Sequence, residues 1–211
     1  MDLDTIYDAV LDGDAPATTA AVQAALANGE TPEAILNDAC IPAMAEVGAL
    51  FEEGEKFVPE MLISARAMAA AMTILRPLLV EAGVETVGTV ILGTVHGDLH
   101  DIGKNLVGMM LEGAGFEVID LGTDVPPQKF VDAVTEHHPH ILGMSALLTT
   151  TTKSMPATLK ALTDAGLRDQ VKVLIGGAPI TEEFAVKIGA DGFAADAGSA
   201  ARAARALMGL N

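Results

Sequence analysis

The feature that most constrains the fold of this chain is a change of hydrophobic pattern near residue 84. Before that point, apolar residues recur at spacings of three and four, which is the period of amphipathic helices. After it, short runs rich in β-branched residues alternate with amphipathic segments. The change predicts two domains, a helical one over residues 1–84 and an α/β one over residues 85–211.

The first half predicts four antiparallel helices with short connections, which form a small bundle. The helices are expected at about residues 3–11, 16–28, 31–51 and 59–81. Thr31 is expected to cap the third helix, and Pro42 to bend or split it. The fourth helix is expected to have one apolar face, formed by Met61, Ala65, Met68, Met72 and Leu75.

The second half predicts five strands separated by helices. The strands are expected at residues 89–92, 116–119, 141–144, 171–175 and 192–194. This alternation favours a parallel sheet covered on both faces, with the flavodoxin-like strand order 2-1-3-4-5. Ligands of such sheets bind at the carboxyl ends of the strands. Three loops are therefore candidates for a binding site, at residues 93–103, 145–152 and 176–179.

Composition argues against several classes of protein. The formal net charge of -17, with no basic run, would repel a nucleic acid backbone. Cys40 is the single cysteine, so it forms no intrachain disulfide and is expected to be a small buried residue of a reducing compartment. The longest apolar run, residues 67–75, is too short to span a bilayer, and the first residues do not resemble a secretory signal. We expect a cytoplasmic protein with no membrane or nucleic acid partner.

The loop at residues 93–103 contains two histidines, two carboxylates and three glycines. Its glycine spacing matches neither a dinucleotide-binding loop nor a phosphate-binding loop. Taken alone, His100 would more often be a helix cap or a solvated side chain. A zinc or magnesium site built on His96 and Asp101 fits no strong template. A second histidine group, at residues 137–140, lies at the opposite edge of the predicted sheet and is expected to be solvated surface.

The spacing of three short motifs changes this interpretation. Asp98-x-His100-x-x-Gly103 is followed after 41 residues by Ser145-x-Leu147, and after a further 28 residues by Gly176-Gly177. This series resembles the signature of cobalamin-binding domains that hold the cofactor with its own base displaced. The resemblance implies that the histidine replaces that base below cobalt. It also implies that the displaced nucleotide tail enters a slot lined by the serine and the glycine pair.

The coordination chemistry of cobalt supports the roles that the resemblance implies for Asp98 and His100. Cobalt accepts imidazole nitrogen, and a ligating histidine usually donates its other N–H to a carboxylate, for which Asp98 is well placed. Similarity to methionine synthase places a hydroxyl six residues after the motif serine, at Thr151, with Thr149, Thr150 and Thr152 as alternatives. The glycine pair would let the tail approach the backbone closely. The predicted cofactor-binding residues here are Gly97, Asp98, Leu99, His100, Asp101, Ile102, Gly103, Ser145, Leu147, Thr149, Thr151, Gly176, Gly177 and Ala178, with His100 as the cobalt ligand.

The helical half carries a second resemblance. Residues 51–61, followed by Ser64-Ala65-Arg66, are similar to the cap over methylcobalamin in methionine synthase and in the short corrinoid proteins of methanogens and acetogens. The resemblance implies that Phe51, Val58 and Met61 pack over the cobalt-bound methyl group. Their alternative role is bundle core, which apolar residues at helical spacing commonly form.

Together the two resemblances imply a corrinoid methyl carrier with no catalytic residues of its own, because 211 residues leave no room for substrate-binding barrels. The implied partners are a substrate-specific methyltransferase, a second methyltransferase acting on tetrahydrofolate or coenzyme M, and a reductive activator. Two alternatives are the cobalamin-binding subunit of an adenosylcobalamin mutase and a cobalamin-dependent sensor. The mutase subunits lack such a cap. The sensors generally use a tryptophan, and this chain has none.

Overall fold

A computed structural model describes residues 2–84 and 86–210 of the chain. Its contacts divide the chain into two compact units. The first contains the residues up to Val87 together with residues 113–115, and the second contains residues 88–112 and those from Phe116 onward. The predicted domain boundary falls beside Glu85, which lies outside the described residues, and it stays a prediction.

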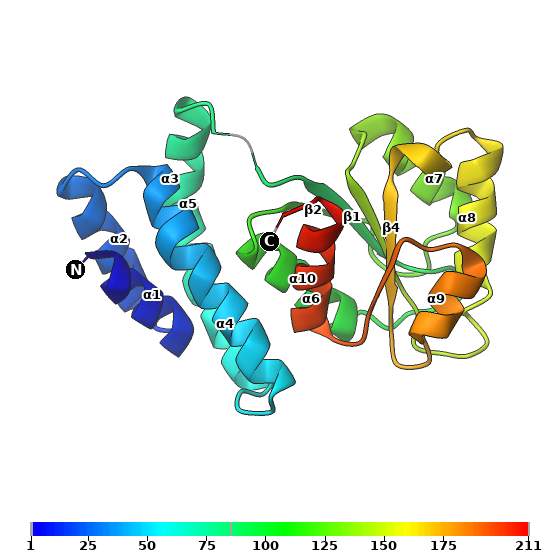
Figure 1. The fold of residues 1–211 in the computed structure, drawn as a ribbon, viewed down its shortest axis with the longest axis horizontal. Coiled ribbons are helices and arrows are strands. Elements are labelled where there is room, and N and C mark those ends of the chain that lie inside the picture. Colours follow the sequence, from blue (N-terminus) through cyan, green and yellow to red (C-terminus); the bar gives the residue numbers. More distant parts are fainter. Residues whose placement is uncertain (1, 85, 211) are drawn as a thin grey trace. The chain divides into compact units, whose positions relative to one another are not determined.

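The first unit is helical, as predicted. Its helices are α1 (Asp2–Asp12), α2 (Ala15–Ala27), α3 (Pro32–Ile35), α4 (Ile41–Glu52) and α5 (Val58–Glu81). The long α5 packs against α1, α2 and α4 (Figure 1). Side chains at two helix starts accept backbone N–H groups that have no partner within the helix. Asp14 caps α2 through Ala17 N at 2.9 Å, and Thr31 caps α3 through Ala34 N at 3.1 Å, as expected for Thr31.

Pro42 splits the predicted third helix through a π-helical turn. The turn, η1 (Leu36–Cys40), lies between α3 and α4, and Pro42 occupies the first turn of α4. A proline has no N–H for the carbonyl four residues earlier, so a continuous α-helix would lose a bond here. In the wider turn the N–H of Ile41 donates to the carbonyl of Leu36, five residues back. The chain thus passes Pro42 without ending the helical stretch.

The buried face of α5 differs in detail from the predicted one. Met61, Met68 and Leu75 are buried as expected, but Ala65 and Met72 are only half-buried. The full set of buried α5 residues is Met61, Ser64, Ala67, Met68, Ala71, Leu75 and Leu79. Ser64 can be buried because its hydroxyl donates to the carbonyl of Leu11 at 3.0 Å. Small residues thus occupy the face where longer side chains were expected.

Among residues 2–84 and 86–210, two helical stretches reach the length and apolar character needed to cross a membrane. They are Pro32–Glu52 and Val58–Glu81, each with a mean hydropathy of 1.4 over its best window. The expectation that no segment is long enough was therefore wrong by this measure, because it counted only uninterrupted apolar runs. The finding is weak evidence for a membrane, since 44% and 33% of these windows are buried and core helices of bundles pass the same test. The cytoplasmic location stays a prediction.

The second unit contains a five-stranded parallel sheet. Its strands are β1 (Thr89–Thr94), β2 (Glu117–Asp120), β3 (Ile141–Ser145), β4 (Lys172–Gly176) and β5 (Gly192–Ala194). The spatial order is β2-β1-β3-β4-β5, and every neighbouring pair is parallel. This confirms the predicted flavodoxin-like order.

Helices cover both faces of this sheet. They are α6 (Ile102–Gly113), α7 (Pro127–His137), α8 (Ser154–Asp164), η2 (Arg168–Gln170), α9 (Glu182–Ile188) and α10 (Ala197–Leu207). Figure 1 shows α6 and α10 on one face, with α7, α8 and α9 on the other. A hydrophobic core lies on the second face, where Ile91, Leu142 and Val173 of the strands pack with Phe130 and Leu159 of the helices.

The ends of the central strands are aligned. Thr94 at the end of β1 pairs with Ser145 of β3, which pairs with Gly176 of β4. The three loops marked by the sequence therefore leave the sheet side by side. Parallel strands in register thus bring to one edge three motifs that are separated by 41 and 28 residues in the chain.

Candidate functional site

Asp98 is the centre of the hydrogen-bond network at this edge. Its side chain is 0% exposed. One carboxylate oxygen, Oδ1, accepts from His100 Nδ1 at 2.6 Å and from the backbone N of His100 at 3.1 Å. The other, Oδ2, accepts from the backbone N of Leu147 at 2.8 Å, the backbone N of Leu148 at 3.2 Å and Thr151 Oγ1 at 2.7 Å. One buried side chain therefore joins the loops that follow β1 and β3.

These bonds keep Asp98 ionised. Burial alone would raise the pKa of its carboxyl, because a low-dielectric surrounding disfavours charge. The hydrogen bonds from Thr151 and His100, followed by those from the backbone of Leu147 and His100, outweigh burial and hold the pKa well below its usual range. The group is therefore a carboxylate at neutral pH and can only accept hydrogen bonds.

The ionised Asp98 determines the tautomer of His100. Because the carboxylate accepts only, the proton of the neutral imidazole must reside on Nδ1. The other nitrogen, Nε2, then keeps its lone pair. Half of the His100 side chain, 50%, is exposed. A half-exposed imidazole held in one tautomer by a buried carboxylate is the arrangement that metal-ligating histidines commonly have.

Thr151 is the threonine that reaches Asp98. Its hydroxyl has one proton and two acceptors within reach, Asp98 Oδ2 and the carbonyl of Leu148 at 2.8 Å. The backbone N of Thr151 already donates to that carbonyl, so the hydroxyl proton is available to the carboxylate. Thr149 is exposed, and its carbonyl accepts from Thr152. The structure thus selects Thr151 from the four adjacent threonines as the partner of Asp98.

The glycine pair has a structural reason that the sequence did not reveal. A Cβ atom on Gly177 would lie 1.9 Å from the carbonyl oxygen of Ala146, and the φ angle of Gly177 is +127°. A Cβ atom on Gly176 would lie 2.8 Å from the carbonyl oxygen of Ala194. Both positions thus need glycine because the backbone at Ala146 and Ala194 of the same domain lies too close for a side chain. This requirement exists with or without a ligand.

The remaining predicted residues of this domain surround the network. Ser145 is half-buried at the end of β3, and Ala178 is exposed in the loop after β4. Leu99, Ile102 and Leu147 have exposed apolar side chains, while the backbone of Leu147 binds Asp98. Asp101 and Gly103 lie at the start of α6, where the Asp101 carbonyl accepts from Asn105 N at 2.8 Å.

Sequence reasoning missed Asp124, which belongs to the loop after β2. Its Oδ1 accepts from Gly97 N at 2.7 Å and lies 2.7 Å from His96 Nδ1. The hydrogen bond from Gly97, together with the pair with His96, lowers the pKa of the Asp124 carboxyl against a smaller opposing effect of burial. The loop after β2 also leaves the carboxyl edge of the sheet, so the rule that marked the other three loops could have identified it.

Other histidines and acids form no metal site in the part of the chain that the structure describes. Within residues 2–84 and 86–210, no three histidine, cysteine, aspartate or glutamate side chains come together. His96 pairs with Asp124 and not with Asp101. His137, His138 and His140 are exposed, as expected, and His140 accepts a hydrogen bond from Thr89 N at 3.1 Å.

The predicted cap residues lie around the turn between α4 and α5. Phe51 is half-buried in the last turn of α4, Val58 is 37% exposed, and Met61 is 1% exposed. The sequence analysis did not single out Phe57, which is 61% exposed. The turn is anchored because Lys56 Nζ donates to the carbonyl of Leu11 at 2.8 Å. Met61 therefore occupies a core position, whereas Phe57 and Val58 present apolar surface.

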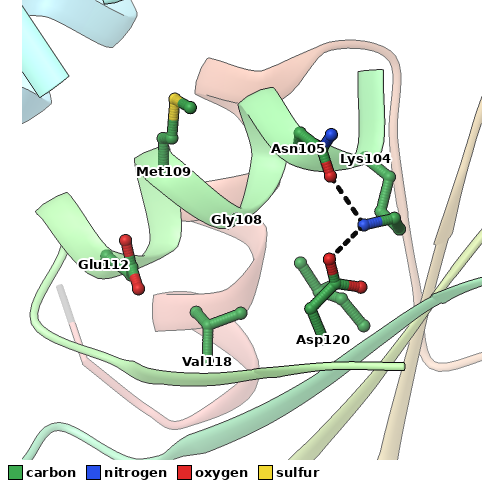
Figure 2. Close-up of a pocket in the computed structure, with 8 residues that line it drawn as sticks. Lys104, Asn105, Gly108, Met109, Glu112, Val118 and Asp120 are labelled. Atoms are coloured by element: carbon green, nitrogen blue, oxygen red, sulfur yellow. Dashed lines mark hydrogen bonds and ion pairs between the residues drawn. The ribbon is translucent and has the colours of Figure 1, made fainter. Parts of the chain in front are cut away.

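A small pocket lies between α6 and the edge strand β2, and it contains none of the predicted residues. Figure 2 shows Lys104 near Asn105 and Asp120 at one end of the pocket, with Met109, Glu112 and Val118 towards the other end. The Lys104 side chain is 2% exposed, and its Nζ lies 2.5 Å from Asp120 Oδ2 and 2.7 Å from Asn105 Oδ1. This ion pair ties the first turn of α6 to the end of β2.

The Lys104–Asp120 pair predicts unequal mutant effects. Asp120→Asn should lower the free energy of unfolding by about 2–3 kcal/mol, because it leaves a buried ammonium without its counter-charge. Lys104→Met should cost only about 1 kcal/mol, since the Asp120 side chain is 47% exposed and water can solvate it. Urea denaturation of both variants measures the difference. An equal or larger loss in Lys104→Met would contradict this account.

Comparison with known proteins covers both halves of the chain. Family models described as B12 binding domains match residues 88–205 and residues 2–76. Trimethylamine corrinoid protein 1 of Methanosarcina acetivorans is 41% identical over 203 residues, 95% of this chain and 94% of that protein. Dimethylamine corrinoid protein 1 of the same organism is 42% identical over 208 residues, 98% and 97% of the two chains.

Two solved structures of cobalamin proteins are also similar to this chain. A cobalamin-binding protein of Desulfitobacterium hafniense has a TM-score of 0.84 at 36% identity, over 98% of both chains. A chain of the methanol:cobalamin methyltransferase complex of Methanosarcina barkeri has a TM-score of 0.85 at 30% identity, over 99% of this chain and 80% of that one. The similarity thus extends across the whole length of the sequence.

Proposed function

This chain belongs to the B12-binding corrinoid proteins of methyl transfer, and we propose that His100 is the axial ligand of its corrinoid, replacing the cofactor's own base. We propose further that the protein carries methyl groups from a substrate-specific methyltransferase to a second methyltransferase, which acts on tetrahydrofolate or coenzyme M. A reductive activator would complete the system.

The observation that carries this proposal is the Asp98–His100 pair. A cobalt ligand must offer a free nitrogen lone pair, and the 2.6 Å contact to an ionised carboxylate reserves Nε2 for that purpose. The half-exposed ring can reach a ligand outside the protein surface. Around it, the exposed apolar side chains of Leu99 and Ile102 offer a surface suited to a large flat macrocycle. The donor set therefore fits the cofactor.

The residues of the site have separable tasks in this proposal. The bound corrinoid supplies the chemistry of accepting and releasing a methyl group. Asp98 fixes the proton on His100 Nδ1 and supports the basicity of Nε2. The Asp98 carboxylate would also stabilise a positive charge on the His100 ring through the contact with its Nδ1. Thr151 in turn holds the Asp98 carboxylate in place.

The cap assignment of the proposal changes in one respect. A side chain that shields a cofactor needs exposed surface within its own unit, and Met61 is buried. We therefore assign shielding to Val58 and to the exposed Phe57, whose turn is held by the Lys56 bond to Leu11. Phe51 is half-buried at the other end of the same turn and supports it from within the bundle.

The relatives suggest the class of methyl donor. The proteins that match this chain at 41% and 42% identity are named for trimethylamine and dimethylamine, and the structural relative at 30% identity belongs to a methanol system. We propose a methylated amine as the donor on this basis. The net charge of -17 would complement basic surfaces on the partner methyltransferases.

The test is reconstitution with hydroxocobalamin, followed by removal of free cofactor. We expect the parent protein to retain about one cobalamin per chain. His100→Ala should lose the absorption features of nitrogen ligation and should bind more weakly by at least the roughly 10–100-fold that loss of an outer-shell partner costs a metal site. His137→Ala is the matched control, because His137 is exposed in the last turn of α7 at the other edge of the sheet. Unchanged spectra for His100→Ala would refute the ligand assignment.

A further inference from the structure

We propose that Asp124 is a positioning residue for the Asp98–His100 pair, holding the turn from which the Asp98 side chain projects. Asp124 belongs to the loop between β2 and α7, so it reaches the pair from a third strand end. The inference rests on the proposed role of His100, but its central readout does not require the cofactor.

Three contacts connect Asp124 to the turn. Its Oδ1 accepts from Gly97 N at 2.7 Å and lies 2.7 Å from His96 Nδ1, and its own N donates to the carbonyl of Asp98 at 2.9 Å. Asp124 therefore holds three consecutive residues through both its side chain and its backbone. A shift of this turn would move the Asp98 carboxylate away from the donors that converge on it.

The loop that carries Asp124 is itself fixed to β1. Thr94 N donates to the carbonyl of Gly122 at 2.9 Å, and Val125 N donates to the carbonyl of Thr94 at the same distance. Val95 and Val125 form an isolated parallel bridge beyond the regular strands. Asp124 is thus attached to the sheet on both sides and can act as a fixed support.

The backbone of Asp124 favours this specific residue type. Its φ angle is +52°, in the left-handed region that few non-glycine residues adopt. Aspartate and asparagine tolerate that region better than most residues because their side chains bond locally to the backbone. Residues held in such conformations often lie at functional sites, where surrounding contacts maintain them. Here the Gly97 and Asp98 bonds are those contacts.

The test compares Asp124→Gly with Asp124→Asn in the full chain. Glycine keeps the left-handed backbone and removes the acceptor, whereas asparagine keeps an oxygen that can accept from Gly97. In the cofactor-free protein, Asp124→Gly should make the His100 Nδ1 proton, observed by nitrogen-15 NMR, exchange faster with water. Asp124→Asn should leave it close to that of the parent. Cobalamin affinity of the glycine variant should fall roughly tenfold, the low end of the range for residues outside the first ligand shell.

Two controls separate positioning from general damage. His138→Gly changes the other described non-glycine residue with a positive φ angle, +45°, at the exposed end of α7. It should alter neither the Nδ1 proton nor the affinity. His96→Gln tests whether the backbone bond from Gly97 or the histidine carries the effect, and we expect a smaller change than in Asp124→Gly.

The outcomes distinguish the two proposals. An unchanged Nδ1 proton and unchanged affinity in a folded Asp124→Gly protein overturn the role of Asp124. An effect of equal size in His138→Gly overturns it too, because the change would then reflect the backbone alone. A faster-exchanging Nδ1 proton in Asp124→Gly supports it even if His100→Ala binds cobalamin normally, and in that case only the ligand assignment fails.

Discussion

Asp98→Asn is expected to lower the free energy of unfolding by about 2–4 kcal/mol and, where its NH₂ group faces His100, to abolish nitrogen ligation in the reconstituted protein. Five donors converge on the Asp98 carboxylate, and the group is fully buried. An amide has only one accepting oxygen, so its NH₂ group must face donors on one side. If it faces Leu147 and Leu148, two backbone N–H groups lose their acceptor inside the domain.

The other orientation of the amide affects the ligand. If the NH₂ group faces His100, the imidazole can accept at Nδ1 only by moving its proton to Nε2. That nitrogen then has no lone pair for a metal. Either orientation is costly, which is why a change of one atom should have a large effect. Urea denaturation of the cofactor-free protein measures the first loss, and the absorption spectrum of the reconstituted protein measures the second.

Acid should diminish the stability difference between Asp98→Asn and the parent. The folded-state pKa of Asp98 lies below its unfolded value, which is about 3.9 for an aspartate. The carboxylate therefore contributes its full stability above that value and loses it as the pH falls towards the folded pKa. Asp164→Asn is the control, because Asp164 is 63% exposed and pairs with Lys160 along the surface of α8. If the stability difference between Asp164→Asn and the parent changed as much with pH, general charge effects would explain the result.

Gly177→Ala is expected to be the most destabilising single substitution considered, with a loss of about 4 kcal/mol or more. Its new Cβ atom would lie 1.9 Å from the carbonyl oxygen of Ala146, a backbone atom that cannot rotate away. The positive φ angle of +127° adds strain for any L residue with a side chain. Relief requires the loops after β3 and β4 to separate. The same movement would pull Leu147 N away from Asp98.

Gly189→Ala separates the effect of the positive φ angle from that of the close contact with Ala146. Gly189 also has a positive φ angle, +80°, but nothing lies within 4 Å of a Cβ atom placed there. Its substitution should therefore cost only about 1 kcal/mol, the usual penalty for the left-handed conformation. Thermal or urea unfolding of both variants measures the contrast. Similar losses for the two would mean that the contact with Ala146 relaxes easily.

The sequence predicted the fold and the centre of the site because both depend on strong local patterns. Alternating strands and helices limit the sheet to few orders, and the rule for parallel sheets then brings Asp98, His100 and Thr151 to one edge. The same rule could have marked the loop that carries Asp124, but the role of Asp124 itself depends on backbone geometry. Neither its φ angle nor its bond to Gly97 has a signature in the order of residue types.

Two further differences between the sequence predictions and the structure also arise from contacts between distant parts of the chain. The glycine pair was interpreted as room for a ligand, but the distances to Ala146 and Ala194 show that the fold already requires it. In the helical unit, periodicity alone could not tell the buried Met61 from the exposed Phe57, because a turn interrupts the period between α4 and α5. Local patterns identify elements well, but they do not report which atoms approach across the fold.

The network around Asp98 also bears on the thermodynamics of cofactor loading. Its bonds are complete in the protein alone, so His100 has its orientation and tautomer before any ligand arrives. A site assembled in advance loses little conformational entropy on binding, and more of the contact energy remains as affinity. Under the proposed ligation, the α/β domain would bind its corrinoid without reorganising the loops that hold His100.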